Sequence, residues 1–261
     1  MKYFGGCDVG STYTKAVILD ENGKMVADTT IRSKINSEQS AIAAMDEVCK
    51  AAGIASSKDL AYLIGTGYGR NKVPFADENI SEISCHAMGV HVTDPSVKAI
   101  IDIGGQDAKI ISLTPDGRMS NFIMNDKCAA GTGRFLEVMA NILRLDIDDL
   151  GTIAAQSDSP AAISSTCTVF AESEVISQLA NGVKRPDLVA GICQSVATRV
   201  ASLARRAGIV ERVCMSGGVA RNEAVRRYMA QALDTEISYD PLAQYFGAIG
   251  AALYAWKQAT K

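Results

Sequence analysis

The spacing of apolar residues along the chain predicts an alternation of helices and short strands. Apolar side chains recur at helical intervals in six segments, at residues 40–52, 133–145, 169–179, 188–207, 222–233 and 243–256. Two short apolar runs, Ala61–Ile64 and Arg212–Met215, are predicted strands, and the glycine-rich segment 65–69 is a predicted loop. Helices and strands mixed in this way predict an α/β fold.

The clearest pattern is an internal repeat of strands and turns. Cys7–Leu19 aligns on Ile101–Leu113 without a gap, and Asp, Gly, Lys and Leu coincide. Further along, the Asn-Gly pair at 22–23 falls on the Asp-Gly pair at 116–117, and such pairs are strong hairpin signals. The pattern indicates a duplicated lobe, although two unrelated hairpins could also produce it.

The repeat also predicts where each lobe lies. The second copy begins just after Pro95, so we expect one lobe at residues 1–95 and the other at 96–244. The small residues of the C-terminal helix, Ala248–Leu253, favour close packing against another helix, and we assign about 245–261 to the first lobe.

Composition excludes several classes of protein. The 261 residues are 48% hydrophobic with a net charge of -3, which is enough for one large or two small cores. The charge gives no reason to expect a nucleic-acid or membrane partner. No segment reaches the roughly 18 apolar residues of a membrane span, and the N-terminus lacks a signal peptide's apolar run. We therefore expect a cytoplasmic protein.

The two repeated turns have the chemistry of a phosphate site. In the first turn Gly10 lets an anion approach the backbone, and the hydroxyls of Ser11 and Thr12 and the ammonium of Lys15 add donors. Asp8 is then left to hold a hydrated Mg²⁺ ion. Either turn alone is more often an ordinary turn than a phosphate site.

The second turn and a later glycine pair complete this candidate site. Asp102 would be a second ligand for metal or water, and Gln106 would orient an attacking water. The pair Gly217-Gly218 follows a predicted strand and lets a flat base lie against bare backbone. The chain has no GxxxxGK[ST] motif, so it is not a P-loop protein.

Two of the seven cysteines stand out. An odd count without a CxxC motif argues against a disulfide framework, a zinc ribbon or a ferredoxin-type cluster. Cys128 and Cys167 each lie in a loop just before a predicted helix, where the helix N-terminus stabilises anionic sulfur. Thr166 or Thr168 would cap the second helix, with an acid in its first turn. Both cysteines could also be inert core thiols, or could complete a Cys₄ site on a dimer axis.

The three nucleotide motifs together resemble a known superfamily. Asp-x-Gly-Ser-Thr, Asp-Ile-Gly-Gly-Gln-Asp and Gly-Gly-Val-Ala are similar to the phosphate-1, phosphate-2 and adenosine motifs of the acetate kinase/sugar kinase/heat-shock/actin superfamily. The resemblance implies two ribonuclease-H-like lobes in an actin-like ATPase fold, with ATP or ADP in the cleft between them. It implies nucleotide contacts from Ser11, Thr12, Tyr13, Thr14, Lys15, Gly104, Gly105, Gln106, Gly217, Gly218, Val219 and Gln244, and catalytic roles for Asp8, Asp102 and Gln106.

The two cysteine segments carry a second resemblance. Asn-Asp-Lys-Cys-Ala-Ala-Gly-Thr-Gly-Arg-Phe and Ser-Ser-Thr-Cys-Thr-Val-Phe-Ala-Glu-Ser-Glu resemble the activator ATPases of 2-hydroxyacyl-CoA dehydratases, such as the 2-hydroxyglutaryl-CoA dehydratase activator. Benzoyl-CoA reductase ATPase subunits share the pattern, and the similarity covers essentially the whole chain. The resemblance implies that Cys128 and Cys167 bind one oxygen-sensitive 4Fe-4S cluster shared by a homodimer. Reduced ferredoxin or flavodoxin would supply one electron, and ATP hydrolysis would drive it to the dehydratase.

The sequence is also compatible with two other functions. A sugar-type small-molecule kinase of the same fold would use Asp102 as its base. A non-enzymatic, actin-like scaffold would bind nucleotide without turnover. Neither alternative explains the two cysteine loops. His86, beside Cys85, is either a structural histidine or, less often at such positions, a metal ligand.

Overall fold

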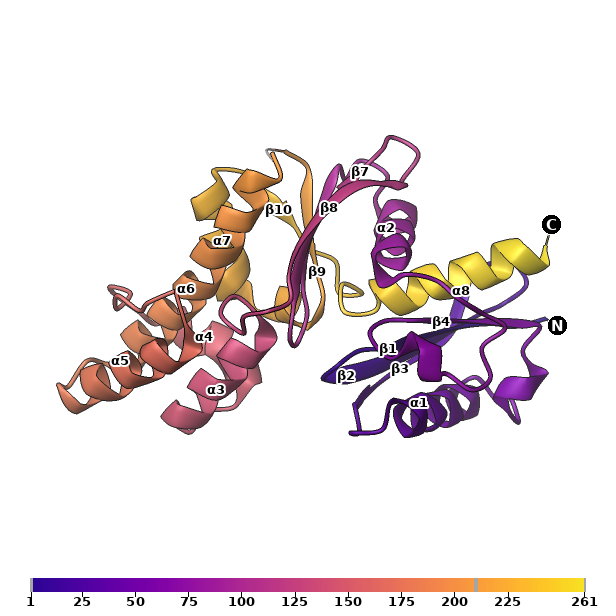
Figure 1. Ribbon diagram of the computed structural model, residues 1–261, viewed down its shortest axis with the longest axis horizontal. Coiled ribbons are helices and arrows are strands. Elements are labelled where there is room, and N and C mark those ends of the chain that lie inside the picture. Colours follow the sequence, from indigo (N-terminus) through magenta and orange to yellow (C-terminus); the bar gives the residue numbers. More distant parts are fainter. Residues whose placement is uncertain (1, 209–210, 261) are drawn as a thin grey trace. The chain divides into compact units, whose positions relative to one another are not determined.

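The computed structural model describes residues 2–208 and 211–260, which form two compact units (Figure 1). The first unit holds the chain through Ser96, the segment Leu113–Met119 and the chain from Gln244 onward. The second holds Val97–Ser112 and Ser120–Ala243. Each unit is built on a mixed five-stranded sheet with helices, which confirms the prediction of an α/β fold with two lobes of the same kind.

The first unit contains a sheet in the order β3-β2-β1-β4-β5. Its strands are β1 (Phe4–Val9), β2 (Tyr13–Leu19), β3 (Met25–Arg32), β4 (Tyr62–Thr66) and β5 (Glu78–Asn79). Its helices are α1 (Ser37–Ala51), α2 (Glu82–Thr93) and α8 (Phe246–Ala259), with short 3₁₀ turns at Ser57–Asp59 and Arg70–Lys72. Helices α1 and α8 cover opposite faces of the sheet (Figure 1). Because β1 is covered on both faces, all six of its residues are buried.

The second unit has a sheet of matching topology, in the order β10-β9-β6-β7-β8. Its strands are β6 (Ala99–Ile103), β7 (Ala108–Leu113), β8 (Met119–Asn125), β9 (Val213–Ser216) and β10 (Ile237–Ser238). Its helices are α3 (Gly133–Leu143), α4 (Leu150–Ala154), α5 (Thr168–Ala180), α6 (Arg185–Arg206) and α7 (Glu223–Leu233), with 3₁₀ turns at Ile147–Asp149 and Gly218–Arg221.

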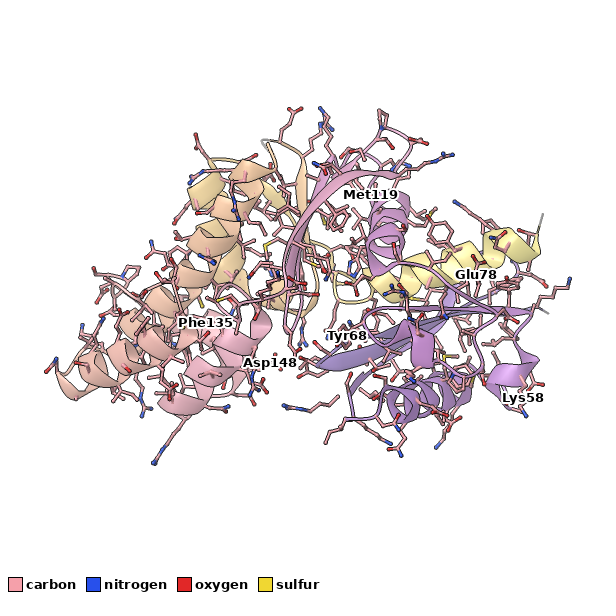
Figure 2. All side chains as sticks on the ribbon, viewed as in Figure 1. Lys58, Tyr68, Glu78, Met119, Phe135 and Asp148 are labelled. Carbon is pink, nitrogen blue, oxygen red and sulfur yellow. The ribbon has the colours of Figure 1, made fainter. Side chains whose placement is uncertain are left out.

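Side-chain exposure differs sharply between positions of the two units. Phe135, on α3 of the second unit, is 1% exposed, whereas Tyr68, after β4 of the first unit, is 84% exposed (Figure 2).

The strand registers confirm the internal repeat and extend it. Asp8 lies opposite Lys15 across β1 and β2, and Asp102 lies opposite Lys109 across β6 and β7. On the other side, Asp8 is the parallel partner of Thr66 and Asp102 is the parallel partner of Ser216. The repeat therefore includes β4 and β9, whose sequences are too short to align by themselves.

All six predicted helices are present, with ends that differ by a few residues, but α2 and α4 were missed. Helix α2 begins at a Ser81 cap that accepts a hydrogen bond from the Ser84 N–H. It packs closely on α8, since a Cβ atom at Gly250 would overlap the Cys85 carbonyl. Because α2 is packed both against α8 and, through His91, against Gly117, its sequence shows no single apolar stripe, and the helical pattern could not be recognised. The loop predicted at 65–69 also begins later, because Gly65 and Thr66 belong to β4.

The turn between β7 and β8, Leu113–Met119, belongs to the first unit. The sequence-based division assigns it to the second lobe with the rest of 96–244. Gly117 has a φ of 75° and packs so tightly on His91 of α2 that a Cβ atom would overlap the imidazole. The lobe boundaries near residues 95 and 245 stay predictions. No helix within residues 2–208 and 211–260 has the length and apolar character needed to cross a membrane.

Candidate functional site

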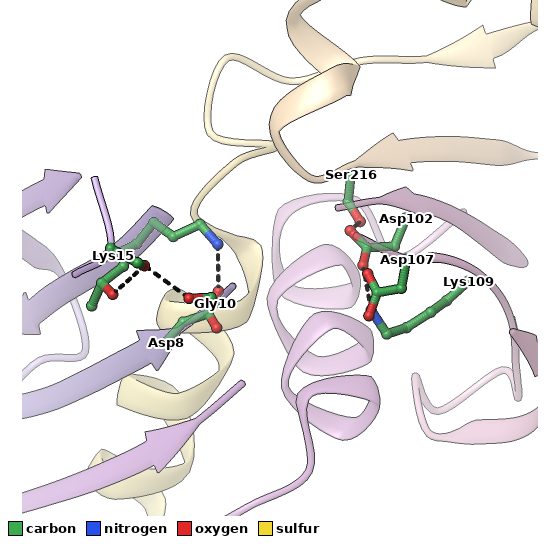
Figure 3. A network of polar contacts seen from close by, with 9 residues as sticks. Asp8, Gly10, Lys15, Asp102, Asp107, Lys109 and Ser216 are labelled. Atoms are coloured by element: carbon green, nitrogen blue, oxygen red, sulfur yellow. Dashed lines mark hydrogen bonds and ion pairs between the residues drawn. The ribbon is translucent and has the colours of Figure 1, made fainter. Parts of the chain in front are cut away.

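The first candidate turn is built around a buried ion pair at the end of β1. Asp8 is 3% exposed, and its Oδ2 atom lies 2.9 Å from the Nζ atom of Lys15 (Figure 3). The pair forms because the two residues face each other across β1 and β2. A carboxylate buried this deeply requires a cationic partner, and the Lys15 ammonium supplies it. Lys15, which the sequence predicts as a phosphate ligand, therefore neutralises the charge of Asp8, the predicted metal ligand, in this structure.

Backbone and hydroxyl bonds hold the turn itself. The Gly10 N–H donates to the Tyr13 carbonyl at 3.2 Å, and the Ser33 hydroxyl donates to the Gly10 carbonyl at 2.8 Å. Thr14 is fully buried and shares a 2.9 Å hydrogen bond with Ser33, so its side chain supports the turn. Ser11 and Tyr13 are exposed and Thr12 is half-buried, so these three are accessible to a ligand. The predicted nucleotide contacts of this turn stay predictions.

Two glycines and a histidine surround the Asp8 carboxylate. A Cβ atom at Gly67, where φ is 88°, would overlap Asp8 Oδ1. A Cβ atom at Gly247 would lie 2.9 Å from Asp8 Oδ2 and 3.0 Å from the Nε2 atom of His86. His86 is 6% exposed, and its imidazole therefore lies close to the end of β1. Its motif, Ser84–Ala87, was visible in the sequence, but only the packing of α2 brings it to Asp8.

The second candidate turn has a larger polar network. The Ser216 hydroxyl donates to Asp102 Oδ1 at 2.7 Å, and Asp102 is 3% exposed (Figure 3). Lys109 Nζ lies 3.4 Å from Asp102 Oδ2 and 2.8 Å from Asp107 Oδ2. One ammonium thus faces two carboxylates, and carboxylate oxygens are of the ligand type that Mg²⁺ takes. The sequence predicts no role for Lys109, Asp107 or Ser216. Lys109 and Asp107 lie in the second copy of the repeat, and Ser216 directly precedes the glycine pair.

A magnesium ion is compatible with this chemistry. Within the described ranges there is no cluster of three or more His, Cys, Asp or Glu side chains able to hold a metal ion. Mg²⁺ commonly keeps several waters and takes only one or two protein carboxylates together with substrate phosphates. Asp8 in the first unit and Asp102 in the second are each a carboxylate of that ligand type.

The turn after β6 is bonded directly to helix α3. The Gly133 N–H donates to the Gly104 carbonyl at 2.9 Å, and the Arg134 N–H donates to the Gly105 carbonyl at 2.8 Å. These donors belong to the first turn of α3, whose N–H groups have no partner within the helix. Gln106 is exposed beside them. Any displacement of the Gly104–Gly105 backbone is therefore transmitted to α3.

The first glycine of the pair after β9 packs against the second turn, and the predicted nucleotide contact of the pair stays a prediction. Gly217 is buried with a φ of 82°, and a Cβ atom there would overlap the Ile103 carbonyl and lie 2.8 Å from Asp102 Oδ1. Any side chain at position 217 would collide with Asp102 and the Ile103 carbonyl, so the position requires glycine whether or not nucleotide binds. Gly218 is exposed and Val219 is 7% exposed, at the start of the 3₁₀ turn. Gln244, the residue after Ala243, is 8% exposed.

The seven cysteines divide into two groups by burial. Five are buried: Cys7, Cys49, Cys85, Cys193 and Cys214. Burial raises the pKa of the Cys85 and Cys193 thiols to about 12, so these remain protonated and unreactive near neutral pH. Cys128 and Cys167 are partly exposed. The two cysteines chosen from their motifs are thus the two that solvent can reach.

The structure brings these two cysteines together within the second unit. The Sγ atom of Cys128 lies 3.9 Å from the carbonyl oxygen of Thr166, the residue before Cys167. The two loops that carry the partly exposed thiols are therefore adjacent.

The predicted cap of α5 is wrong. Cys167 itself occupies the N-cap position, without a side-chain hydrogen bond to the helix, and there is no acid in the first turn. The hydroxyl of Thr168 has no hydrogen-bond partner among the described residues. The first N–H groups of α5 therefore receive no side-chain cap, and they can stabilise an anionic sulfur at Cys167.

Comparison with known proteins gives full-length matches. Residues 6–255 match the model of the BadF/BadG/BcrA/BcrD ATPase family. The (R)-2-hydroxyglutaryl-CoA dehydratase activating ATPase of Acidaminococcus fermentans is 52% identical, with 99% of each chain covered. The 2-hydroxyisocaproyl-CoA dehydratase activator of Clostridioides difficile is 49% identical, with 98% of this chain and 96% of that protein covered. The crystal structure of component A of the Acidaminococcus fermentans dehydratase is 51% identical, covers 100% of both chains and gives a TM-score of 0.95.

Proposed function

The chain belongs to the BadF/BadG/BcrA/BcrD ATPase family, and from this membership we propose that it is the ATP-hydrolysing activator of a 2-hydroxyacyl-CoA dehydratase. The observation that carries the proposal is the meeting of Cys128 with the Thr166–Cys167 segment. Relatives that match nearly the whole chain bear the names of such activators. A kinase or a nucleotide-binding scaffold would need no such pair of accessible thiols.

Cys128 and Cys167 would bind the cluster together with the same two residues of a second copy. Two chains on a two-fold axis contribute four thiolates, which is the ligand set of a 4Fe-4S cluster. Such a cluster supplies a one-electron carrier. The uncapped start of α5 stabilises sulfur charge at Cys167, and the nearby Thr166 carbonyl restricts the Cys128 loop. One cluster per homodimer follows from this stoichiometry.

Nucleotide would bind through the two repeated turns. Asp8 and Asp102 would hold Mg²⁺ through its waters, and Gln106 would orient the water that attacks the terminal phosphate. Lys15 and Lys109 each lie beside one of these carboxylates, so their charges are available to phosphate oxygens when the metal binds. Gly217, Gly218, Val219 and Gln244 would contact the adenosine end.

The bonds between the second turn and α3 suggest how turnover would reach the thiols. The Gly104 and Gly105 carbonyls accept from the first turn of α3, and the loop with Cys128 leads into that helix. A change in the turn on ATP binding or hydrolysis would therefore move the Cys128 loop. Reduced ferredoxin or flavodoxin would give one electron, and the dehydratase would receive it. Because the relatives are named for different acyl-CoAs, the acyl group is a property of the dehydratase partner.

Anaerobic purification tests this proposal most directly. We expect about one 4Fe-4S cluster per two chains by iron and sulfide analysis, a dimer by mass, and an EPR signal after reduction. Cys128→Ser and Cys167→Ser should each lose the cluster. Cys49→Ala is the matched control, because Cys49 is buried and should not affect iron content. A metal-free monomer that still hydrolyses ATP would overturn the proposal.

A further inference from the structure

The loop that carries Cys167 is held at Ser164 from two helices. The Ser164 N–H donates to Glu174 Oε2 of α5 at 2.7 Å, and the Ser195 hydroxyl of α6 donates to the Ser164 carbonyl at 3.1 Å. The Thr166 N–H donates to the Ser164 hydroxyl at 3.3 Å, which connects this anchor to the residue before Cys167. Both backbone groups of Ser164 are therefore bonded to side chains from outside the loop.

These hydrogen bonds lie beside a cavity. A cavity of about 360 Å³ is lined by Ser164, Glu174 and Ser195 together with neighbouring residues of α6. A loop with open space beside it can move once its hydrogen bonds are broken. The loop also packs on α6, where a Cβ atom at Gly191 would overlap the Ala161 carbonyl, and the bonds to Ser164 hold the part nearer Cys167.

A second side chain holds the loop that carries Cys128. The Asn125 side-chain amide donates to the Cys128 carbonyl at 3.0 Å and to the Ala130 carbonyl at 3.3 Å. One donor group thus bridges both sides of the turn around Cys128. The Thr132 hydroxyl adds a 2.7 Å bond to the Ala129 carbonyl. Asn125 and Glu174 both belong to the motifs that contain the cysteines, yet neither has a sulfur-ligating role.

We propose that Glu174 and Asn125 are positioning residues, each of which fixes one of the two thiols in the geometry that ligation requires. Glu174 acts on Cys167 through Ser164, and Asn125 acts on Cys128 through its carbonyl. A bond from a backbone N–H to a carboxylate is stronger than one between neutral groups, which suits Glu174 to this task. The consequence for a cluster rests on the proposed function, whereas the positions of the thiols do not.

Thiol alkylation in the metal-free full-length chain tests the proposal without a cluster. The chain is stripped of iron by a chelator without oxygen, treated briefly with iodoacetamide, and analysed by peptide mass spectrometry. Losing a hydrogen bond to a charged carboxylate raises the population of the open loop about 10–100-fold, and losing one between neutral groups raises it about fivefold. We expect Glu174→Ala to accelerate labelling of Cys167 about 10–100-fold and to leave the labelling of Cys128 unchanged. Asn125→Ala should accelerate labelling of Cys128 by at least about fivefold and leave the labelling of Cys167 unchanged.

Two further variants separate positioning from a general loss of structure. Glu174→Gln keeps an acceptor oxygen and should restore slow labelling of Cys167. Glu172→Ala removes a carboxylate of the same helix that has no hydrogen bond to Ser164, and it should label like the wild type. Equal acceleration at both cysteines, or none at either, would overturn the proposal. Thermal unfolding of each variant identifies any that has lost its fold.

Iron retention supplies the second readout. Loss of an outer-shell contact typically lowers metal affinity about 10–100-fold, so Glu174→Ala and Asn125→Ala should release iron to a chelator faster by a comparable factor. A wild-type chain without iron would contradict the proposed function while the alkylation result still decides the role of Glu174 and Asn125. If labelling changes selectively but iron release does not, then Glu174 and Asn125 position the thiols only in the metal-free protein. That result would contradict the inference for the cluster.

Discussion

The two units contain the same carboxylate–lysine pair in different surroundings. Asp8 faces one lysine and lies against two glycines near His86. Asp102 shares its lysine with Asp107, accepts a bond from Ser216, and lies in a strand whose turn is bonded to α3. Duplication thus supplied the carboxylate–lysine framework twice, but among the described residues only the second copy is bonded to a helix that follows a cysteine loop. Under the proposed function, the first turn would bind nucleotide alone, and the second would both bind it and pass the change to α3.

The largest expected effect comes from removing either carboxylate. Asp8→Asn and Asp102→Asn should each lower kcat for ATP hydrolysis about 10²–10³-fold, because each removes charge that stabilises the metal and phosphate. Phosphate release measured across a Mg²⁺ titration checks this. Asp116→Asn, which changes an exposed acid paired with Arg118, is the control. Full activity in either site variant would show that the corresponding turn does not bind the reacting phosphates.

The second test uses the glycines that touch the carboxylates. Gly67→Ala and Gly217→Ala place a methyl group against Asp8 and Asp102 at positive φ, and each should cost about 2–5 kcal/mol of unfolding free energy. Urea unfolding measures it. Gly182→Ala is the matched control, because Gly182 has a φ of 83° with nothing within 4 Å of its Cβ position. It should cost only about 1 kcal/mol. Equal losses at all three sites would mean that backbone strain alone is responsible.

A smaller effect distinguishes the equivalent hydroxyls of the two units. Ser216→Ala removes a hydrogen bond to the buried Asp102 carboxylate and should cost about 1–3 kcal/mol. Thr66 occupies the matching register position beside Asp8, but its hydroxyl faces the Cys85 thiol, a weak hydrogen-bond group, and makes no such bond to the carboxylate. Thr66→Val should therefore cost less than Ser216→Ala in urea unfolding. A similar loss in both variants would erase this difference between the units.

The smallest expected change concerns the bond between the second turn and α3. Gly133→Pro removes the N–H that donates to the Gly104 carbonyl, and proline is tolerated at the first position of a helix. Gly133→Ala keeps this N–H and adds a Cβ atom that, like that of proline, lies near the Gly104 oxygen. ATP should alter the alkylation rate of Cys128 in Gly133→Ala more than in Gly133→Pro, by roughly the fivefold value of one hydrogen bond. An equal ATP response would exclude this bond from the coupling.

Local pattern was enough to predict much of the framework. The strand–turn–strand repeat, the six helices and the choice of Cys128 and Cys167 were all readable, because each depends on residues that are near neighbours in the chain. Helix α2 was hidden because it is packed against α8 through glycines and has no single apolar face. The cap of α5 was missed because Cys167 takes the position that a threonine usually fills.

The sequence by itself therefore determined the duplicated α/β framework, the paired Asp-Gly turns and the residue types available for metal and phosphate. Tertiary structure alone decided that Ser216 reaches Asp102, that His86 lies near Asp8, and that Cys128 meets Thr166, a residue 38 positions away. The physical reason is the range of the interactions. Hairpin registers and turns follow from contacts between near neighbours, whereas these meetings depend on the pairing of strands distant in the sequence and on how whole helices pack.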